Sequence, residues 1–428
     1  MLSWFEDAKL GIFIHYGIYA VDGVSESWSF HNGVISYEDY MKQLDGFTAS
    51  RLNADHWAEL IERSGAKYAV LTTKHHDGVA LFDTKYSDLS VVKRTPAQRD
   101  IVKAYAEAIS KRGIRLGLYY SLIDWSHPDY PSVFPGGIVP DDLSRVNRFS
   151  EPSDGVQDEE RWQRFLQFNR HQLSEILTRY GTVDLLWFDG DWERSAEQWG
   201  LPEFKAYLRS FHPEIIINSR LAGHGDYKTP EQGLPITRPE GPWEFCTTIN
   251  TSWGYQPKDQ KYKSLKQIIR MFCDCISMGG NMLLNIGPRE DGTIDPRQAD
   301  ILLGLGNWIR KHEEAVYGTV EGLMTRYWLG GSTLSKDRKT LYLFVYDDPK
   351  ECVCLKGLCN PIQKITILHS GKELKYDIHG GVPWFNIPGT TWIDMTPEDC
   401  HEHVTVLKLE FAEPIEMYGG SGAVVTHN

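Results

Sequence analysis

The sequence predicts an α/β fold, a (β/α)8-like TIM barrel followed by a small C-terminal antiparallel β-sandwich. Through the first three quarters of the 428 residues, apolar runs of strand length alternate with amphipathic helical segments. This alternation is typical of a parallel sheet covered by helices. From about residue 326, strand-like runs follow one another without helices, which indicates antiparallel pairing. We therefore expect a barrel over residues 1–325 and a β-sandwich over 326–428.

The predicted barrel strands are nearly continuous in apolar residues, as strands buried on both faces must be. They are 10–17, 67–78, 114–121, 183–190, 214–220 and 281–288. The helices between and after them are predicted over 55–66, 100–113, 159–181, 264–280 and 295–318. Six or more such units favour a barrel, with a doubly wound open sheet as the alternative. The Pro-, Gly- and Ser-containing region 127–157 is expected to form a long surface loop near the barrel mouth.

The C-terminal part shows the two-residue period of half-buried strands. In the last run, Leu407, Leu409 and Phe411 alternate with Lys408 and Glu410. The other predicted strands there are 340–346, 364–368 and 373–378. Turn residues separate these runs, which favours a small β-sandwich.

Composition excludes several classes of protein. Lys and Arg number 45 against 58 Asp and Glu, giving a net charge of −13, which argues against nucleic-acid or anionic-membrane partners. Seven Cys residues without zinc-ligand spacing fit neither a disulfide scaffold nor a zinc site. No apolar run reaches membrane-spanning length and no signal peptide is recognisable, so we expect a cytoplasmic protein as the chain stands, or a secreted, periplasmic or lysosomal one if a leader was removed. A homo-oligomer is left open.

Chemistry-bearing side chains recur where the predicted strands end. These ends are His15-Tyr16, Lys74 to Asp77, Tyr119-Tyr120, Trp187 to Trp192 and Asn218 to Arg220. Buried runs that break into polar residues cost free energy unless those groups are paired or serve a site. Because the carboxyl ends of barrel strands share one face, the sequence predicts a functional site at that face.

Asp189 is the strongest candidate for catalysis. It directly follows an apolar run and precedes a Gly, and Trp187 and Trp192 beside it can form walls for a sugar ring. A glycosidase needs two carboxyl groups, which stand about 5–5.5 Å apart in a retaining enzyme. The second carboxyl can come from Glu231 or Glu244, and their spacing in the sequence does not decide between them.

Histidines at the strand ends allow two interpretations. His15, His75 and His76 could ligate a metal together with a carboxylate. Adjacent residues on an extended strand point to opposite faces, which argues against that reading for His75 and His76. We instead expect hydrogen bonds from these rings to substrate hydroxyls, with no metal and no organic cofactor. Arg220 should pair with a carboxylate or reach a ligand oxygen, and Trp253 serves as packing or as a wall facing the sugar.

In order along the chain, these strings resemble glycoside hydrolase family 29, the retaining α-L-fucosidases. The matching stretches are GIFIHYG, KHHDG, YYS…DW, WFDG, the Arg after IIIN, TTINTSWGY and NMLLNIGP, which together span roughly residues 3–290. The β-rich C-terminal segment also suits the barrel-plus-sandwich layout of that family. Some members carry Glu directly before the Trp that corresponds to Trp28, whereas here Ser27 stands there and Glu26 lies one residue earlier.

The resemblance implies a role for each matching residue. Asp189 would be the nucleophile that forms a fucosyl-enzyme intermediate, and Glu231, favoured over Glu244, the acid/base. Arg220 resembles the family's active-site Arg, and Trp253 matches an aromatic position near the methyl group of the sugar. The residues implied to hold the fucose ring and hydroxyls are His15, Trp28, His75, His76 and Tyr120.

The function expected from this resemblance is exo-acting hydrolysis of terminal α-L-fucosyl linkages with retention of configuration. The expected partner is a fucosylated oligosaccharide or glycoconjugate. Two alternatives remain at this level. One is a fucose-binding protein on a degenerate barrel, and the other is a metal-dependent barrel hydrolase that uses His15, His75 and His76.

Overall fold

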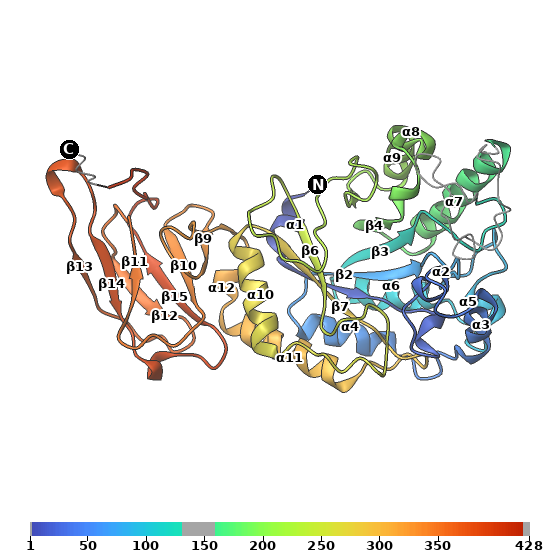
Figure 1. Cartoon of the computed structure of the whole chain (residues 1–428), viewed down its shortest axis with the longest axis horizontal. Coiled ribbons are helices and arrows are strands. Elements are labelled where there is room, and N and C mark those ends of the chain that lie inside the picture. The colour runs from blue at the N-terminus through green and yellow to red at the C-terminus, as the bar shows by residue number, and fades with distance from the viewer. Residues whose placement is uncertain (1, 131–158, 423–428) are drawn as a thin grey trace.

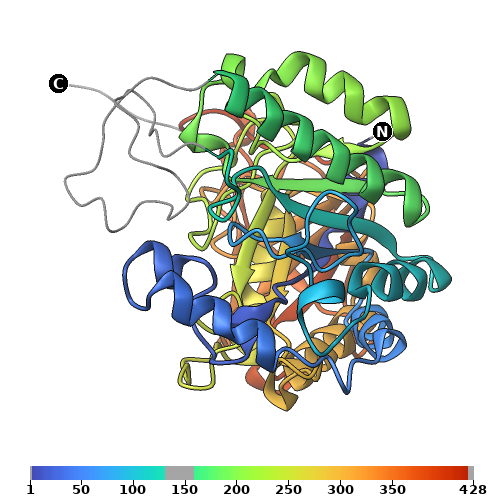
Figure 2. The ribbon, with the colours of Figure 1, turned by 90° about the vertical axis from the view of Figure 1, so that its right-hand side faces the viewer.

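The computed structural model of the chain describes residues 2–130 and 159–422. Its N-terminal part is built on a seven-stranded parallel sheet with the strand order β5-β4-β3-β2-β1-β7-β6. The strands of this sheet are β1 Leu10–Ile14, β2 Tyr68–Lys74, β3 Arg115–Ser121, β4 Leu185–Asp189, β5 Ile216–Ile217, β6 Glu244–Thr248 and β7 Asn281–Ile286. Helices surround the sheet, and the C-terminal sheets lie to one side of it (Figures 1 and 2).

An extended segment, 227–231, lies between the two edge strands β5 and β6. Tyr227 forms a parallel bridge with Asn218 just after β5, whereas Lys228 and Glu231 bridge to the β6 side. The backbone N–H of Glu244 donates to the carbonyl of Lys228 at 2.8 Å. The curled sheet is therefore connected across its gap by single bridges instead of a continuous ladder.

Helices surround this sheet, most of them on its outer face (Figures 1 and 2). In the described residues they are α1 Ser3–Ala8, α2 Trp28–His31, α3 Tyr37–Met41, α4 Ala54–Arg63, α5 Val91–Arg94, α6 Ile101–Lys111, α7 Glu159–Arg179, α8 Ala196–Trp199, α9 Leu201–Phe211, α10 Leu265–Ser277, α11 Pro296–Lys311 and α12 Glu313–Val316. Side chains before several helices accept from free N–H groups, as Asp100 does from Lys103, which explains where these helices begin. None of the described helices is long and apolar enough to cross a membrane.

Large rings fill the interior of the curled sheet. Inward-facing residues of successive strands pack together, among them Phe13, Tyr68, Tyr119, Trp187 and Tyr227. Because alternate residues of a strand face opposite sides, the remaining apolar residues contact the helices, and most strand positions are buried. The interior is thus a packed core, and space for a ligand remains only at its end.

The C-terminal part consists of a five-stranded and a three-stranded antiparallel sheet, with strand orders β12-β15-β10-β9-β8 and β11-β14-β13. Their strands are β8 Thr319–Glu321, β9 Gly331–Ser335, β10 Thr340–Val345, β11 Cys352–Leu355, β12 Lys364–Ile367, β13 Tyr376–His379, β14 Thr390–Asp394 and β15 Thr405–Glu410. Leu407 and Leu409 point into the core of these sheets, as their alternation predicts. Phe344 and Val406 face the other way and join the core of the N-terminal part.

The structure differs from the sequence prediction at several elements. β5 is much shorter than the predicted 214–220, and β6 is absent from the prediction because its Thr247 and Thr248 look polar although both are buried. The five-stranded antiparallel sheet already begins at β8, ahead of residue 326. Of the predicted loop 127–157, residues 131–157 lie outside the described part. Short 3-10 turns are η1 Ile18–Ala20, η2 Lys42–Gly46, η5 Asp191–Glu193, η6 Pro383–Phe385 and η7 Pro397–Asp399.

Candidate active site

A cavity of ≈190 Å³ opens at the carboxyl end of the strands of the curled parallel sheet. Its lining residues are Phe13, His15, Glu26, Trp28, His75, Tyr119, Trp187, Asp189, Trp192, Arg220, Glu231 and Trp253. These residues come from the ends of β1, β3 and β4 and from the loops that follow β1, β2, β4, β5 and β6. The volume lies below the roughly 300–1,000 Å³ of sites for drug-sized ligands, which suits a single sugar ring.

Asp189 ends β4 in a tightly held position. The side chain of Asn218 binds the backbone of the preceding Phe188 twice, accepting from its N–H at 2.8 Å and donating to its carbonyl at 2.9 Å. The carbonyl of Asp189 itself accepts from Leu122 N–H at 2.8 Å. Gly190 then turns the chain with a φ of +87°, where a Cβ would stand 2.7 Å from the Ile123 side chain. Asp189 is therefore a rigidly positioned carboxylate.

One guanidinium joins the two candidate catalytic carboxylates. Arg220 donates through Nη1 to Asp189 Oδ1 at 2.7 Å and through Nη2 to Glu231. Tyr119 O–H donates to the other oxygen of Asp189 at 3.1 Å. The Arg220 guanidinium also lies over the Trp187 ring, 4.6 Å from its centroid, which fixes its plane. Because both carboxylates bond to neighbouring nitrogens of one planar group, they stand close together at the same cavity.

His15 is held as a neutral hydrogen-bond acceptor toward the cavity. The amide nitrogen of Asn285 donates to Trp253 O at 2.7 Å, so its oxygen faces His15 Nδ1 at 2.6 Å. His15 Nδ1 must then carry the proton, which leaves the Nε2 lone pair free. Burial lowers the pKa of His15 to about 4. Near neutral pH the ring can therefore accept a hydrogen bond from a sugar hydroxyl.

His75 and His76 lie on the same side of the sheet edge, in contrast to the sequence expectation. β2 ends at Lys74, so the strict alternation of a strand no longer applies, and the two ring centroids are 4.3 Å apart. His75 Nδ1 is 2.7 Å from Ser27 Oγ. His76 Nδ1 donates to Ser121 Oγ at 2.6 Å, because that hydroxyl donates its own proton to Ile123 O. Burial holds the pKa of both histidines well below the usual range.

The sequence alternative of a metal site has a partial counterpart here. In the described part of the chain, one group of potential ligands converges, with atoms of His75, His76 and Asp189 all within 4.8 Å of one another. His76 Nε2 lies 3.6 Å from Asp189 Oδ2. The Arg220 guanidinium already neutralises the same carboxylate at 2.7 Å, so a second cation there would face direct charge repulsion. His15, the third predicted metal ligand, is not part of this group.

Aromatic rings form the walls of the cavity. Trp28 stacks with Trp192 at a centroid distance of 6.3 Å and an interplanar angle of 18°. Trp253 packs on His15 at 4.9 Å. Trp187 lines the cavity beneath Arg220. Flat apolar walls with polar groups between them are suited to a sugar ring, which has both apolar faces and hydroxyl edges.

Tyr119 takes the place that the sequence reading gave to Tyr120. Neighbouring residues of β3 face opposite sides, and Tyr120 points away from the cavity to Asn169 and Gln172, at 2.8 Å from each side-chain oxygen. Tyr119 pairs in register with Trp187 and lines the cavity. Trp187 and Asp189 face the cavity from β4, and the residue of β3 that pairs with Trp187 is Tyr119. The alternation of side chains along these two strands therefore identifies Tyr119 as the cavity residue. In the same way, Phe13 and His15 are two residues apart at the end of β1, and both line the cavity.

Glu26, which the sequence analysis noted beside Ser27 without assigning it a role, also lines the cavity. Its φ of +23° is unusual for a residue with a side chain, and it brings the carboxyl group inward. Glu26 Oε1 accepts from the N–H of Gly254 at 2.5 Å, which ties this loop to the loop that carries Trp253. Burial raises the pKa of Glu26 to about 7. Ser27, which stands where some family members have Glu, holds His75 instead.

Glu244 lies deeper inside the curled sheet and outside the lining of the cavity. It begins β6, and its carboxyl group accepts from Tyr68 O–H at 2.5 Å and from Trp187 Nε1 at 2.9 Å. Its side chain is fully buried. Glu244 therefore supports Trp187 from below, whereas Glu231 reaches the cavity itself.

The burial of Glu244 predicts a pH-dependent stability. Burial raises its pKa in the folded chain to about 7 from an ordinary 4.5, so folding favours the protonated acid. As the pH rises, the Glu244 side chain ionises in the unfolded chain before it does so in the folded chain. This residue should therefore lower the free energy of unfolding by about 3 kcal/mol between about pH 4.5 and 7. Glu244→Gln should remove that share of the decrease, measured by urea unfolding at pH 5 and pH 8. The exposed Glu107→Gln is the matched control and should leave the decrease unchanged; an equally steep decrease in Glu244→Gln contradicts this account.

Comparisons with known proteins agree with this geometry. Residues 1–314 match the sequence model of the family described as α-L-fucosidase. Tissue α-L-fucosidase from Bos taurus is 31% identical over 413 residues, covering 88% of this chain and 82% of that protein. The corresponding human enzyme is 32% identical over 346 residues, covering 74% and 69%.

Solved structures agree in fold over nearly the whole chain. α-L-Fucosidase isoenzyme 1 from Paenibacillus thiaminolyticus superposes with a TM-score of 0.85 at 32% identity, covering 96% of this chain and 99% of that one. A family 29 α-L-fucosidase from Bacteroides thetaiotaomicron, a trapped covalent intermediate with 2-fluoro-fucosyl fluoride, gives 0.81 at 27% identity, covering 96% and 95%. The chain belongs to the α-L-fucosidases, family 29 of the glycoside hydrolases.

Proposed function

We propose that this chain removes terminal α-L-fucosyl residues from oligosaccharides or glycoconjugates, with retention of configuration and with Asp189 as nucleophile and Glu231 as acid/base. The observation that carries this proposal is the Arg220 guanidinium bonded to both carboxylates at one small cavity. Retaining glycosidases need their two carboxyl groups only about 5–5.5 Å apart, and two groups held by one guanidinium fit that demand. The covalent intermediate trapped in a relative that is 27% identical supports the same chemistry.

The roles of the two carboxylates follow from their surroundings. The side chain of Asp189 is 12% exposed and that of Glu231 is 38% exposed. A nucleophile benefits from a fixed, enclosed position, which Tyr119 and Arg220 provide for Asp189. An acid/base must meet the departing oxygen and then a water molecule, which suits the more open Glu231 at the mouth.

In the first step, Asp189 attacks the anomeric carbon and forms a C–O bond to the sugar. The bond to the leaving oxygen breaks, and Glu231 donates its proton to that oxygen. In the second step, Glu231 takes a proton from water as the water oxygen attacks the same carbon. The bond to Asp189 then breaks, and L-fucose leaves with the original anomeric configuration.

The lining of the cavity would explain why the enzyme acts on terminal residues and why it is specific for one small sugar. We infer that His15, whose Nε2 is unprotonated, accepts a hydrogen bond from a sugar hydroxyl, and that His75, which also lines the cavity, contacts the sugar. Trp28 and Trp253 lie on either side as apolar surfaces for the ring and its methyl group. A cavity closed in this way holds a terminal residue and leaves the rest of the glycan outside.

The finer architecture belongs to the same proposal. Segment 227–231 would act as the eighth strand of a (β/α)8-like barrel, completed by its bridges to Asn218 and to Cys246. The proposed division into residues 1–325 and 326–428 would leave β8 as the connecting strand between the barrel and a C-terminal sandwich.

The test is hydrolysis of p-nitrophenyl α-L-fucoside in the presence and absence of EDTA, followed by proton NMR. We expect p-nitrophenol release at an unchanged rate with the chelator, because the charge of Asp189 is already matched by Arg220. We also expect the first product to be α-L-fucose. Initial formation of β-L-fucose would show inversion, and loss of activity with EDTA, restored by a metal ion, would favour the metal-dependent alternative.

A further inference from the structure

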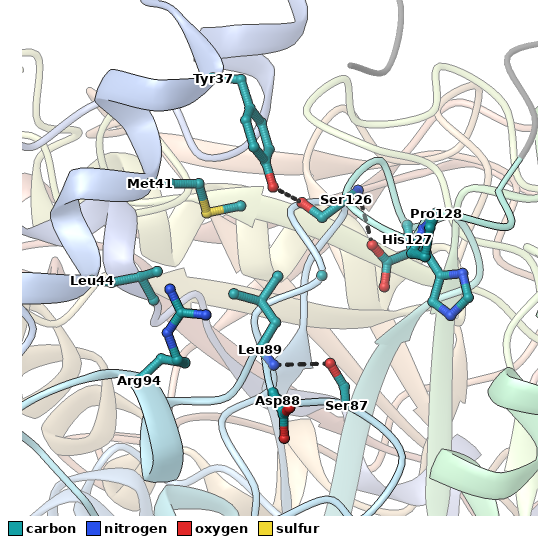
Figure 3. Close-up of a pocket in the computed structure, with 12 residues that line it drawn as sticks. Tyr37, Met41, Leu44, Ser87, Asp88, Leu89, Arg94, Ser126, His127 and Pro128 are labelled. Carbon is teal, nitrogen blue, oxygen red and sulfur yellow. Dashed lines mark hydrogen bonds between the residues drawn. The ribbon is translucent and has the colours of Figure 1, made fainter. Parts of the chain in front are cut away.

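A second, larger cavity of ≈420 Å³ lies on the other side of the loops that follow β2 and β3. Its lining residues are Tyr37, Met41, Leu44, Gly78, Ser87, Asp88, Leu89, Arg94, Asp124, Ser126, His127 and Pro128. Figure 3 shows Tyr37, Arg94 and His127 placed around the same space. None of these residues lines the first cavity. The volume lies within the range of sites that bind small molecules.

The two cavities share one stretch of chain as a wall. Asp124 and Ser126 line the second cavity, while the ring of Trp125 between them packs against Trp28 at 5.1 Å and His76 at 5.0 Å. Ser126 Oγ also donates to the carbonyl of Asp77 at 2.7 Å, which holds this wall in place. A ligand in the second cavity would therefore lie directly behind the aromatic wall of the first one.

The second cavity carries one unmatched positive charge. Asp88 is paired with Lys93 at 3.1 Å, and Asp124 is paired with the buried Lys74 at 3.4 Å. Within residues 2–130 and 159–422, the guanidinium of Arg94 has neither an ion pair nor a hydrogen bond. A guanidinium presents donors in a planar fork that fits carboxylate and sulfate groups.

The rest of the lining suits a sugar ring. Met41, Leu44 and Leu89 provide an apolar surface. Ser126 Oγ accepts from Tyr37 O–H at 2.8 Å and donates to the carbonyl of Asp77, so this hydroxyl oxygen keeps one lone pair for a ligand hydroxyl (Figure 3). His127 Nδ1 accepts from the N–H of Asp129 at 3.1 Å, which leaves the N–H at Nε2 as a donor.

We propose that this second cavity binds an acidic monosaccharide unit, with its carboxylate or sulfate on Arg94 and its apolar face on Met41 and Leu89. The unit can be a free sugar acid or an acidic residue of the glycan whose fucose occupies the first cavity. The binding site itself does not depend on catalysis. Only the second source of the ligand, an acidic residue of the fucosylated glycan, rests on the proposed function. Binding and turnover are therefore measured separately.

The direct test is binding of methyl β-D-glucuronide to the full chain, followed by ligand-observed NMR, with methyl β-D-glucoside as the neutral match. We expect the glucuronide to bind about tenfold more tightly, because the two ligands differ in the carboxylate alone. Arg94→Gln should abolish the difference and Arg94→Lys should retain part of it. Lys103→Gln, an exposed cation on α6, is the control and should bind like the wild type.

A competition experiment separates the two cavities. L-Fucose at saturating concentration should leave glucuronide binding unchanged, because the sugars occupy different sites. Displacement by L-fucose, equal affinity for the neutral glucoside, or unaltered binding in Arg94→Gln each overturns the proposal. These outcomes do not require turnover and remain readable if the chain proves inactive on fucosides.

A second measurement identifies the source of the acidic unit. The ratio of kcat/KM for an acidic against a neutral fucosylated oligosaccharide is compared between wild type and Arg94→Gln. If the unit belongs to the substrate, the ratio should fall about tenfold in the variant, with p-nitrophenyl fucoside turnover unchanged. If the ratio stays the same while glucuronide binding is lost, the ligand is a free sugar acid.

Discussion

Asp189→Ala should lower kcat/KM for p-nitrophenyl α-L-fucoside by about 10³-fold or more, because the variant can form no glycosyl-enzyme bond. The cavity itself should survive, since the backbone at this position is fixed by Leu122 and by the Asn218 clamp on Phe188. Steady-state release of p-nitrophenol measures the loss. Thermal unfolding confirms that the variant is folded.

Azide gives the Asp189 prediction a chemical signature. A small anion can occupy the space of the missing carboxylate and attack the same face of the sugar, so Asp189→Ala with azide should yield β-L-fucosyl azide. The matched control is Asp191→Asn, two residues along the same loop and outside the cavity lining. We expect the control to keep activity within about tenfold, the range of a modest positioning effect. Asp189→Ala with near wild-type turnover would refute the mechanism at its centre.

Glu231→Ala should lose activity in proportion to how poorly the leaving group departs. p-Nitrophenol leaves without much help, whereas a sugar oxygen needs a proton, so the loss should approach about 10²–10⁴-fold only for methyl or oligosaccharide fucosides. The measurement is kcat/KM for the two substrate types in wild type and variant. With azide, the variant should form α-L-fucosyl azide, because azide then attacks the intermediate on Asp189.

Glu244→Gln is the informative comparison for Glu231. Its carboxyl group is bound by Tyr68 and Trp187 beneath the cavity, so we expect a similar modest loss for both leaving groups and no azide product. A leaving-group-dependent loss in Glu244→Gln, with none in Glu231→Ala, would exchange the two assignments.

Much of the site could be predicted because its residues belong to strongly patterned strands. Asp189 follows an unbroken apolar run and precedes a Gly with positive φ, and the structure places it in the cavity beside Arg220. The family, and the enzyme class that it implies, were also accessible from short strings such as WFDG and KHHDG.

The remaining features of the site could not be predicted, because they depend on where each strand ends and on which residue lies opposite on the neighbouring strand. The end of β2 at Lys74 decides that His75 and His76 share one side, and the parity of β3 decides for Tyr119 over Tyr120. Glu244 looked like a loop residue because β6 begins with it and continues into Thr247 and Thr248. These outcomes depend on tertiary pairing, which a single sequence does not encode in its local pattern.

The backbone segments that carry Asp189 and Glu231 differ in how well they can tolerate insertions and deletions. Asp189 belongs to a strand that pairs in full register with β3, so an insertion beside it would shift a ladder that extends through the core. Glu231 sits on a segment attached by isolated bridges at Asn218, Trp243 and Cys246. Insertions and deletions can accumulate there without disturbing Asp189. The segment is thus the natural place for evolution, or for loop grafting in the laboratory, to alter which leaving groups this enzyme accepts.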